Sequence, residues 1–379
     1  MKKKVFYWSP HINCEVATVK AVLNSAYGLK KYNKTYEPTI INAFGEWSEF
    51  SNELTSKDLN TKKLIDLKIK LPINGYLQSR IFYIYFSILS LIPLYKLIKK
   101  EKPDYLIIHL ITVPVLIIAI FFNFKTKFIL RISGYPKLNI LRKLFWKLSS
   151  KKIFKVFTPT EITKNLLVKE KIFTTNQTFL LSDPIITIRK IPQLKNSEID
   201  KNLRNKNFVL SIGRLTKQKN FSLLINAVIK LSENYKKINL LIIGDGNLKN
   251  YLVNKTKYYK NIKIINWKSK LSKYYLNSDL FVLPSYYEGL PNVMLDAMNH
   301  EIPIISTNCS GASDILQKNS GGFIIPINNQ KELEKKIIFT MKNYSSAKRK
   351  IIKAKKKIHM FSDKNLFKYY ELFCDISRH

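Results

Sequence analysis

The sequence is short of acidic residues and of cysteine. Its 379 residues include 26 Asp and Glu against 65 Lys and Arg, which leaves a formal net charge of +39. So large an excess of positive charge favours anionic surroundings, such as phosphorylated ligands, an acidic membrane or nucleic acid. The three cysteines, Cys14, Cys309 and Cys374, are far apart and odd in number, so they predict neither a disulfide framework nor a metal cluster. They are typical of a protein of the reducing cytoplasm.

Sequence patterns of nucleic-acid-binding proteins are also missing. Neither zinc-finger spacing nor an aromatic box of the RNA-recognition type occurs in the sequence. The basic residues are spread along the whole chain, as solvated lysines usually are. We therefore expect no nucleic-acid partner, and a basic nucleic-acid-binding protein stays an alternative that the charge alone supports.

No apolar run in the sequence clearly reaches the length of about 20 residues that a membrane-spanning helix needs. Residues 81–98 contain two serines, a proline and a lysine, and residues 105–122 contain a histidine, a threonine and a proline. The first segment predicts a buried helix, and the second predicts a buried strand, a loop and a helix. The apolar residues near the N-terminus are too few for the core of a signal peptide and predict a first strand.

The sequence does contain two series of short apolar strands that alternate with helices. Its length exceeds one ordinary core, so two domains are expected. Alternating strands and helices predict parallel sheets covered on both faces, and hence two Rossmann-like, doubly wound α/β domains that face a cleft. The polar residues 188–207 are the predicted linker between them. The predicted strands span residues 4–8, 105–109, 127–132, 155–158, 208–213, 239–246 with a turn, 262–266, 280–283 and 302–306.

An acidic segment follows one of these strands. Glu288 stands in a glycine turn, Pro291 is placed as the first residue of a helix, and Asp296 lies further along that helix. The N-terminus of a helix favours an anion such as phosphate, and carboxylates on either side can hold hydroxyl groups. The segment therefore suggests a nucleotide-sugar site.

A basic segment follows the first strand of the C-terminal half. Gly213 permits a tight turn there, and Arg214 and Lys219 stand near the end of the strand. A pair of cations at this place can stabilise a departing diphosphate without a metal, although a solvated basic loop explains the same residues. The glycines of the Gly244-Asp-Gly246 turn permit close approach to a ligand, and an ordinary turn explains them equally well.

In their order and spacing, these three segments resemble the retaining GT-B glycosyltransferases of the group-1 family, in particular those of bacterial surface-polysaccharide synthesis. The match consists of Gly-Arg-Leu and Gln-Lys within residues 213–219, the Gly-Asp-Gly turn, and Pro-Ser-Tyr-Tyr-Glu-Gly-Leu-Pro at residues 284–291 with an acid at 296. The resemblance covers essentially all of residues 205–330 and extends more softly to residues 130–137 and 157–161.

The resemblance implies a division of labour between the domains. Residues 1–187 would bind the acceptor, residues 208–355 would bind the nucleotide-sugar donor, and the helical residues 356–379 would cross back to the N-terminal domain. Arg214 and Lys219 would bind the donor diphosphate. Glu288 would contact hydroxyl groups of the sugar.

The resemblance implies two further contacts, each with a reservation. Asp296 would meet the nucleotide ribose, where the family usually has the longer Glu. His109 would touch the donor sugar, and a satisfied core histidine is the alternative. The predicted catalytic residues are Glu288, Arg214, Lys219 and His109, and the predicted donor-binding residues are Gly213, Arg214, Lys219, Gly244, Gly246, Glu288, Gly289, Leu290 and Asp296.

The predicted function is the retaining transfer of a sugar from a nucleotide-diphosphate sugar to a saccharide or lipid-linked saccharide, in the synthesis of O-antigen, capsule or lipopolysaccharide. The other class of glycosyltransferase usually binds its donor through a metal held by Asp-x-Asp, and this motif is absent from the 379 residues. We therefore expect a metal-independent reaction with no cofactor besides the nucleotide-sugar. A sugar-nucleotide epimerase of the same fold stays an alternative.

One basic segment suggests a membrane partner. Residues 138–152 combine apolar residues at helical spacing with a face of Lys and Arg, the pattern of an interfacial helix on anionic lipid. A surface helix whose apolar stripe packs on its own domain is the alternative. Because acceptors in the resembling family are commonly lipid-linked, we expect a cytoplasmic protein with peripheral contact to the inner face of the plasma membrane.

Overall fold

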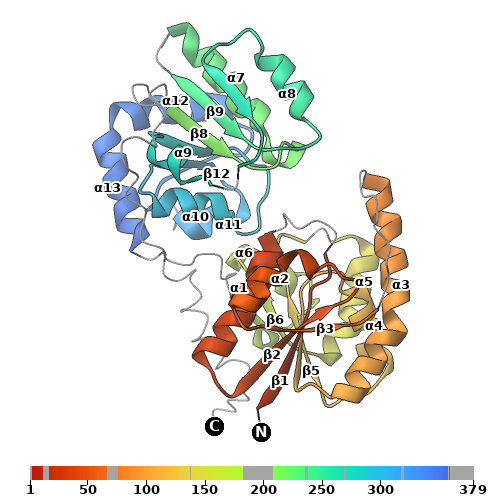
Figure 1. The fold of residues 1–379 in the computed structure, drawn as a ribbon. Helices are drawn as coiled ribbons and strands as arrows, with labels where there is room; N and C mark the ends of the chain where they lie inside the picture. The colour runs from red at the N-terminus through yellow and green to blue at the C-terminus, as the bar shows by residue number, and fades with distance from the viewer. Residues whose placement is uncertain are drawn as a thin grey trace. The chain divides into compact units, whose positions relative to one another are not determined.

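A computed structural model describes residues 2–11, 17–65, 76–136, 138–181, 208–234, 238–268, 270–316, 320–356 and 358. Two compact units divide the chain, one within residues 1–187 and the other within residues 188–360 (Figure 1). The predicted linker, residues 188–207, lies outside the described residues, as do Cys14, Cys374 and nearly all of the predicted segment 356–379. The predicted domain limits stay a prediction.

In the part of the chain that the structure describes, the first unit is built on a seven-stranded sheet in the order β3-β2-β1-β4-β5-β6-β7. All neighbouring strands are parallel. The strands are β1 (Lys3–Trp8), β2 (Tyr36–Asn42), β3 (Asn60–Lys63), β4 (Tyr105–Ile108), β5 (Lys127–Arg131), β6 (Ile153–Thr158) and β7 (Thr178–Leu180). The α-helices are α1 (Ala17–Tyr32), α2 (Ser51–Ser56), α3 (Tyr76–Glu101), α4 (Val113–Phe121), α5 (Ile140–Ser149) and α6 (Glu161–Lys169).

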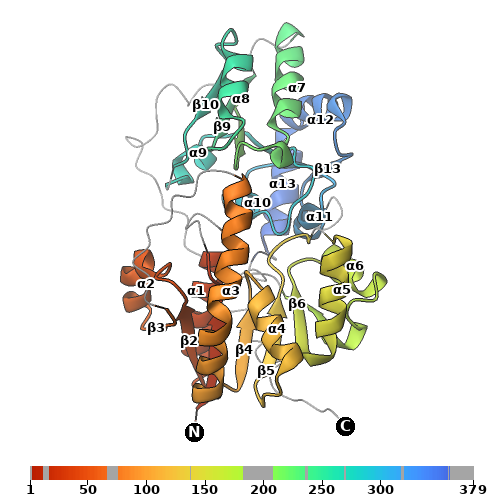
Figure 2. The same cartoon turned by 90° about the vertical axis from the view of Figure 1, so that its right-hand side faces the viewer.

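Alternate residues of each strand point to opposite faces, and helices cover both faces of this sheet (Figure 2). Val5 and Tyr7 of β1 pack in a core with α1 and α2. Phe6 and Trp8 pack in a second core with α3, α4, α5 and α6. Strands that are apolar on both sides are typical of parallel sheets, because both faces are buried.

The second unit repeats this plan with six described strands in the order β10-β9-β8-β11-β12-β13, again all parallel. The strands are β8 (Phe208–Ile212), β9 (Asn239–Ile243), β10 (Ile262–Ile265), β11 (Leu280–Leu283), β12 (Ile304–Thr307) and β13 (Phe323–Ile325). The α-helices are α7 (Phe221–Asn234), α8 (Lys249–Thr256), α9 (Ser272–Leu276), α10 (Asn292–Asn299), α11 (Ser310–Leu316), α12 (Gln330–Lys342) and α13 (Tyr344–Lys355).

Both sheets place the first strand of the unit near the middle. The chain builds outward from β1 to β3, then returns to place β4 on the other side of β1, and it does the same from β8 to β10 and back to β11. The direction of winding therefore reverses between β1 and β4, and again between β8 and β11. Ligands of doubly wound sheets bind at the carboxyl ends of the strands at such switch points. The fold thus indicates one candidate position in each unit.

The predicted fold class, two doubly wound α/β domains, is confirmed. All nine predicted strands are present, with ends shifted by one or two residues in most cases. The strands β2, β3, β7 and β13 were not predicted. β3 has the sequence Asn-Thr-Lys-Lys at an edge of the sheet, and β7 and β13 have three residues each, so none of these three carries a long apolar pattern.

The prediction for residues 105–122 is confirmed by β4 and α4. The prediction of a buried helix at residues 81–98 is only half correct. These residues belong to the helix α3, but Ile84, Ile88 and Ile92 on one side are each more than 60% exposed. Apolar residues occur on every side of the helix, so its periodicity could not reveal an exposed side. Among the described residues, no helix is both long enough and apolar enough to span a membrane.

Candidate functional site

The predicted donor-binding loops meet at the switch point of the second unit. The loop with Arg214 and Lys219 follows β8, and the loop with Glu288 follows β11, which pairs directly with β8. The Gly244-Asp-Gly246 turn follows β9, the neighbour of β8 on its other side. Because these strands are parallel, their carboxyl ends lie at one edge of the sheet. Lys219 and Glu288, 69 residues apart in the sequence, are thereby brought together.

A buried ion pair joins two of these loops. Lys219 Nζ lies 2.5 Å from Glu288 Oε1, and the two side chains are 13% and 7% exposed. Ser285 Oγ donates a hydrogen bond to the same carboxylate oxygen at 2.6 Å. Glu288 Oε2 accepts no hydrogen bond from the described residues. The carboxylate is therefore held rigidly by one oxygen and presents the other as an acceptor.

The pairing of Lys219 with Glu288 refines the roles predicted from the sequence. The sequence predicted that Lys219 contacts the donor diphosphate and that Glu288 contacts the sugar, as two separate contacts. In the structure Lys219 also orients Glu288, and its ammonium has three donors, of which this pair uses one. Lys219 can thus hold the carboxylate and still donate to an anion. Ser285 was not predicted as a site residue, although it lies inside the matched segment.

A second set of hydrogen bonds ties the same two loops. Tyr286 N donates to Gln218 O at 2.9 Å, and Gln218 Nε2 donates to Tyr287 O at 2.8 Å. Arg214, in contrast, is exposed and makes no ion pair or hydrogen bond through its side chain with any residue that the structure describes. The site therefore combines a buried ion pair with an exposed cation, Arg214, that pairs with no described residue.

The predicted glycines allow the loops to pack closely. A Cβ at Gly213 would lie 3.3 Å from Lys219 Cε, so the lysine stem lies directly over this glycine. A Cβ at Gly244 would lie 1.9 Å from Gly213 O, and one at Gly246 would lie 2.5 Å from Leu215 O. The Gly-Asp-Gly turn thus packs directly on the loop that follows β8. This contact explains the glycines of the turn, and their contact with a donor stays a prediction.

The start of α11 contacts the Glu288 loop and holds it in place. Ser310 Oγ donates a hydrogen bond to the backbone oxygen of Glu288. A Cβ at Gly311 would lie 1.7 Å from Gly289 O, so no larger residue fits while this loop keeps its place. Gly289 and Leu290 are half-buried within the loop. Pro291 caps α10 and precedes its first residue, one position from the prediction.

A buried thiol lies near Glu288. Burial, together with the negative charge of Glu288, raises the pKa of Cys309 to about 11. The thiol is therefore neutral at ordinary pH, and thiolates rather than thiols act as nucleophiles. The pKa of Cys309 thus depends in part on the charge of Glu288, and the neutral thiol has a packing role.

The second predicted carboxylate is Asp296, half-buried on α10. Its backbone oxygen is 2.7 Å from His300 Nδ1 and also accepts the His300 N–H at 3.1 Å. Burial, together with the negative charge of Asp296, raises the pKa of Tyr275 well above its usual range. The contact of Asp296 with a ribose stays a prediction.

The switch point of the first unit carries His109, directly after β4. Its side chain is buried, and neither ring nitrogen has a hydrogen-bond partner in the described part of the chain. Burial, and then the positive charge of Arg131, holds the pKa of His109 well below its usual range. The ring is therefore neutral, stacked against Tyr7 with 6.2 Å between the ring centres.

Other buried polar atoms without described partners follow the strand next to that of His109. They are Ser9 Oγ and His11 Nε2, which come after β1, the neighbour of β4. Two residues beyond His109, Ile111 has a φ of +46°, which is strained for a β-branched residue. Unpaired buried polar atoms and strained backbone both concentrate at functional sites. Within the described part of the chain, His109 is therefore not a satisfied core histidine, and its contact with a donor sugar stays a prediction.

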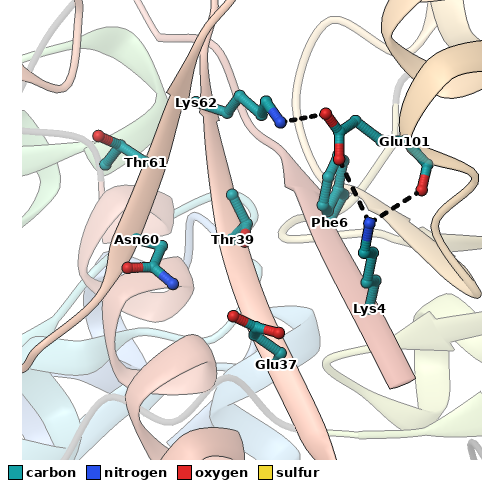
Figure 3. Close-up of a pocket in the computed structure, with 8 residues that line it drawn as sticks. All are labelled: Lys4, Phe6, Glu37, Thr39, Asn60, Thr61, Lys62 and Glu101. Atoms are coloured by element: carbon teal, nitrogen blue, oxygen red, sulfur yellow. Dashed lines mark hydrogen bonds and ion pairs between the residues drawn. The ribbon is translucent and has the colours of Figure 1, made fainter. Parts of the chain in front are cut away.

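A hollow of about 270 Å³ lies elsewhere in the first unit (Figure 3). Residues near the beginning of β1 and β2 line it, so it lies away from the carboxyl ends of these strands. Glu101 there binds Lys4 at 3.4 Å and also binds Lys62, which fastens the end of α3 to the sheet. The hollow contains none of the predicted site residues. Across the described residues, no three His, Cys, Asp or Glu side chains lie together as metal ligands would.

Comparisons with known proteins agree with this geometry. The family model "Glycosyl transferases group 1" matches residues 194–357. An uncharacterized glycosyltransferase of Methanocaldococcus jannaschii is 28% identical over 310 residues, which cover 76% of this chain and 73% of that protein. A UDP-Gal:alpha-D-GlcNAc-diphosphoundecaprenol alpha-1,3-galactosyltransferase of Escherichia coli is 28% identical over 271 residues, covering 63% and 67%.

A solved structure shows the same fold. The crystal structure of HepE from Anabaena in complex with UDP superposes with a TM-score of 0.73 at 13% identity, covering 98% of this chain and 99% of that one. This likeness supports the fold, whereas the family model and the named relatives support a glycosyltransferase. The comparisons thus support the predicted class of enzyme, a glycosyltransferase.

Proposed function

We propose that this GT-B glycosyltransferase transfers a sugar from a nucleotide-diphosphate sugar to a saccharide or lipid-linked saccharide, with retention and without a metal ion. The observation that carries the proposal is the Lys219–Glu288 pair, held by Ser285, with the exposed Arg214 in the same loop as Lys219. It lies at the switch point of the second sheet, where doubly wound proteins bind their ligands.

The names of similar proteins support the choice of substrates. The E. coli relative is named for a UDP-galactose donor and a diphosphoundecaprenol-linked acceptor, and the HepE crystal contains UDP. Another relative, from Erwinia amylovora, is named for amylovoran biosynthesis. We therefore propose a UDP-sugar donor, a lipid-linked saccharide acceptor and a role in surface-polysaccharide synthesis such as that of O-antigen, capsule or lipopolysaccharide.

The residues of the second unit would serve two needs of the reaction. As the bond between the anomeric carbon and the diphosphate breaks, negative charge develops on the diphosphate. Arg214 and the remaining donors of Lys219 are fixed cations that stabilise this charge, a task that other enzymes give to a metal. The free oxygen of Glu288 would accept a hydrogen bond from a sugar hydroxyl and so orient the ring.

The other predicted residues complete the proposal. Asp296 would hold the ribose, and His109 would donate or accept one hydrogen bond with the donor sugar, since its neutral ring can do either. The anomeric carbon forms its new bond with an acceptor hydroxyl oxygen, and the nucleoside diphosphate leaves with the electron pair of the broken bond. The proton of the acceptor hydroxyl passes to the departing diphosphate.

Product analysis tests the proposal. The purified protein is incubated with UDP-sugars and a diphosphoundecaprenol-linked saccharide in the presence of EDTA, and the anomeric configuration of the product is read by NMR. We expect a glycoside with the configuration of the donor. A product of inverted configuration would contradict retention, and activity that EDTA abolishes would contradict metal independence.

A control with donor alone tests the alternative of an epimerase. An epimerase converts the donor without any acceptor, whereas the proposed transferase leaves the sugar of the donor unchanged. Epimerised donor in this control would therefore contradict the proposed function. The family model and the relatives favour the transferase over this alternative and over a nucleic-acid-binding protein.

A further inference from the structure

The helix α5 has an apolar side that is largely exposed among the described residues. Trp146 packs onto the sheet from the opposite side of the helix. The exposed side carries Ile140, Leu141, Leu144 and Leu148, which are between 55 and 78% exposed. The alternative, packing on its own domain, therefore holds for Trp146 and Phe145 and not for these four exposed residues. Single exposed apolar residues are ordinary, but contiguous apolar patches mark interaction sites.

The helix α3 repeats this feature. Ile84, Tyr85, Ile88 and Ile92 are between 47 and 67% exposed. Their spacing along the chain, i, i+1, i+4 and i+8, is the same as that of the four residues on α5. This spacing places each set of four within one narrow stripe along its helix. Two separate helices of the first unit thus expose matching aliphatic stripes.

The two helices belong to the same layer. Both α3 and α5 contribute to the core on one face of the sheet, and α4 packs against each of them (Figure 2). The last residue of α4, Phe121, is 75% exposed. One face of the first unit therefore has exposed large apolar side chains on three neighbouring helices.

Basic residues accompany the stripes. Lys96 and Lys100 continue along α3 beyond Ile92, and Lys147 and Lys151 lie on and just after α5. All four are exposed, and none forms an ion pair with a described residue. No acidic residue occurs in α5, and the only one in α3 is Glu101 at its end. The face is thus apolar and cationic together.

We propose that the stripes of α3 and α5, with these four lysines, form a docking surface for an anionic lipid bilayer. Aliphatic side chains can enter the boundary between headgroups and acyl chains while lysines bind lipid phosphates, and the two contributions add. A second copy of the chain fits less well, because each copy carries a formal charge of +39. Nucleic acid fits the lysines and leaves the aliphatic stripes exposed.

This inference goes beyond the proposed function, since binding to lipid requires neither donor nor acceptor. It extends the prediction of an interfacial helix, which concerned residues 138–152 only, to α3. An enzyme that acts on a lipid-linked acceptor would gain from such a surface, because it confines the protein to the plane in which the acceptor lies.

Vesicle sedimentation of the full chain tests the docking surface. We expect binding to vesicles of phosphatidylglycerol and phosphatidylcholine, and weaker binding to phosphatidylcholine alone. The variants Leu141→Glu with Leu148→Glu, and Ile88→Glu with Ile92→Glu, should each bind at least about tenfold more weakly. Tyr251→Glu with Tyr258→Glu makes the same charge change at two exposed residues of the second unit and should bind within about twofold of the unaltered protein.

A second pair of substitutions separates charge from apolar contact. Lys147→Gln with Lys151→Gln should weaken binding to the anionic vesicles by about fivefold for each lysine and leave binding to neutral vesicles unchanged. Melting temperatures check that all variants fold. Absence of vesicle binding by the unaltered protein, or an equal loss in the tyrosine control, would overturn the proposal.

The other possible occupants have their own signatures. A dimer in analytical ultracentrifugation that the stripe variants abolish would assign the surface to a second copy and overturn the proposal. Binding that duplex DNA competes away and that only the lysine changes reduce would assign it to a polyanion. A protein that binds vesicles but no UDP-sugar would contradict the proposed function and leave the docking surface standing.

Discussion

At the residue scale, the buried pair of Lys219 and Glu288 has both a structural and a binding role. Each partner is nearly withdrawn from water, so each depends on the other for compensation of its charge. Arg214 differs, because it is exposed and has no described ion-pair partner. Loss of Lys219 or Glu288 should therefore affect both folding and activity, and loss of Arg214 should affect activity alone.

The first prediction concerns the stability of this pair. Lys219→Met or Glu288→Gln leaves the partner buried without full compensation and should lower the free energy of unfolding by about 3 kcal/mol. The double variant should lose less than the sum of the two, because it leaves no isolated charge. Urea unfolding measures all three. Arg214→Met is the control and should stay within about 0.5 kcal/mol of the unaltered protein; a strictly additive double variant would contradict the coupling.

The second prediction concerns His109 and pH. The pKa of its ring is lowered in the folded protein, so below about pH 6.5 the unfolded chain binds a proton that the folded protein does not. The free energy of unfolding should therefore fall as the pH drops from 7 to 5, with a share from His109 of up to about 1.4 kcal/mol per pH unit.

The variant His109→Gln isolates this share. His11 and His300, whose pKa values are also lowered by burial, are present in both proteins and cancel in the comparison. Urea unfolding at pH 7 and at pH 5 should show a shallower loss of stability in the variant. Equal losses in the two proteins would show that His109 does not carry the effect.

At the element scale, the Glu288 loop depends on helix α11. The contact of Gly311 with Gly289 is backbone against backbone, so neither side can yield by a change of rotamer. The loop between β11 and α10 thus owes its position to a helix that follows it by about 20 residues in the chain.

The third prediction tests this support. Gly311→Ala should displace the loop at residues 289–291, weaken UDP-sugar binding by about tenfold, and lower the free energy of unfolding by about 1–3 kcal/mol through overpacking. Calorimetric titration and urea unfolding provide the two values. Gly134→Ala is the matched control, because a Cβ at Gly134 would meet no atom within 4 Å. Unchanged donor binding in Gly311→Ala would mean that the loop does not form the donor site.

Much of the fold and part of the site could be predicted from the sequence. Strands such as β11 and helices such as α7 have local apolar patterns, and the cap of α6 at Thr160 also follows from a local rule. The polar edge strand β3 has no such pattern, because only pairing with β2 makes it a strand. The exposed stripe of α3 could not be predicted, because apolar residues occur on every side of this helix and give no clear periodicity.

The site shows the same limit. Arg214, Lys219 and Glu288 could be found because each lies directly after a strand with a recognisable turn. The ion pair between Lys219 and Glu288 could not be found, because it depends on β8 and β11 being neighbours, which is a property of the sheet. Ser310 and Gly311 support the loop through contacts that no local spacing reveals.

At the scale of the whole molecule, two units with the same winding carry different groups at their switch points. The first presents ring nitrogens of His109 and His11 that have no partner among the described residues, and the second presents cations and a held carboxylate. The sequence already showed the charge of +39, but only the structure shows lysines without a described ion-pair partner on the helices that carry the apolar stripes.

The most direct test of the account is the turnover of a UDP-sugar by Arg214→Ala compared with Lys217→Ala. Both residues are exposed cations of the same loop, and only Arg214 is assigned to the diphosphate. A charge-assisted contact contributes about 1.5–3 kcal/mol, so Arg214→Ala should lower kcat/KM by at least about tenfold while Lys217→Ala stays within about twofold. Equal turnover by the two variants would contradict a donor site at the switch point of the second unit.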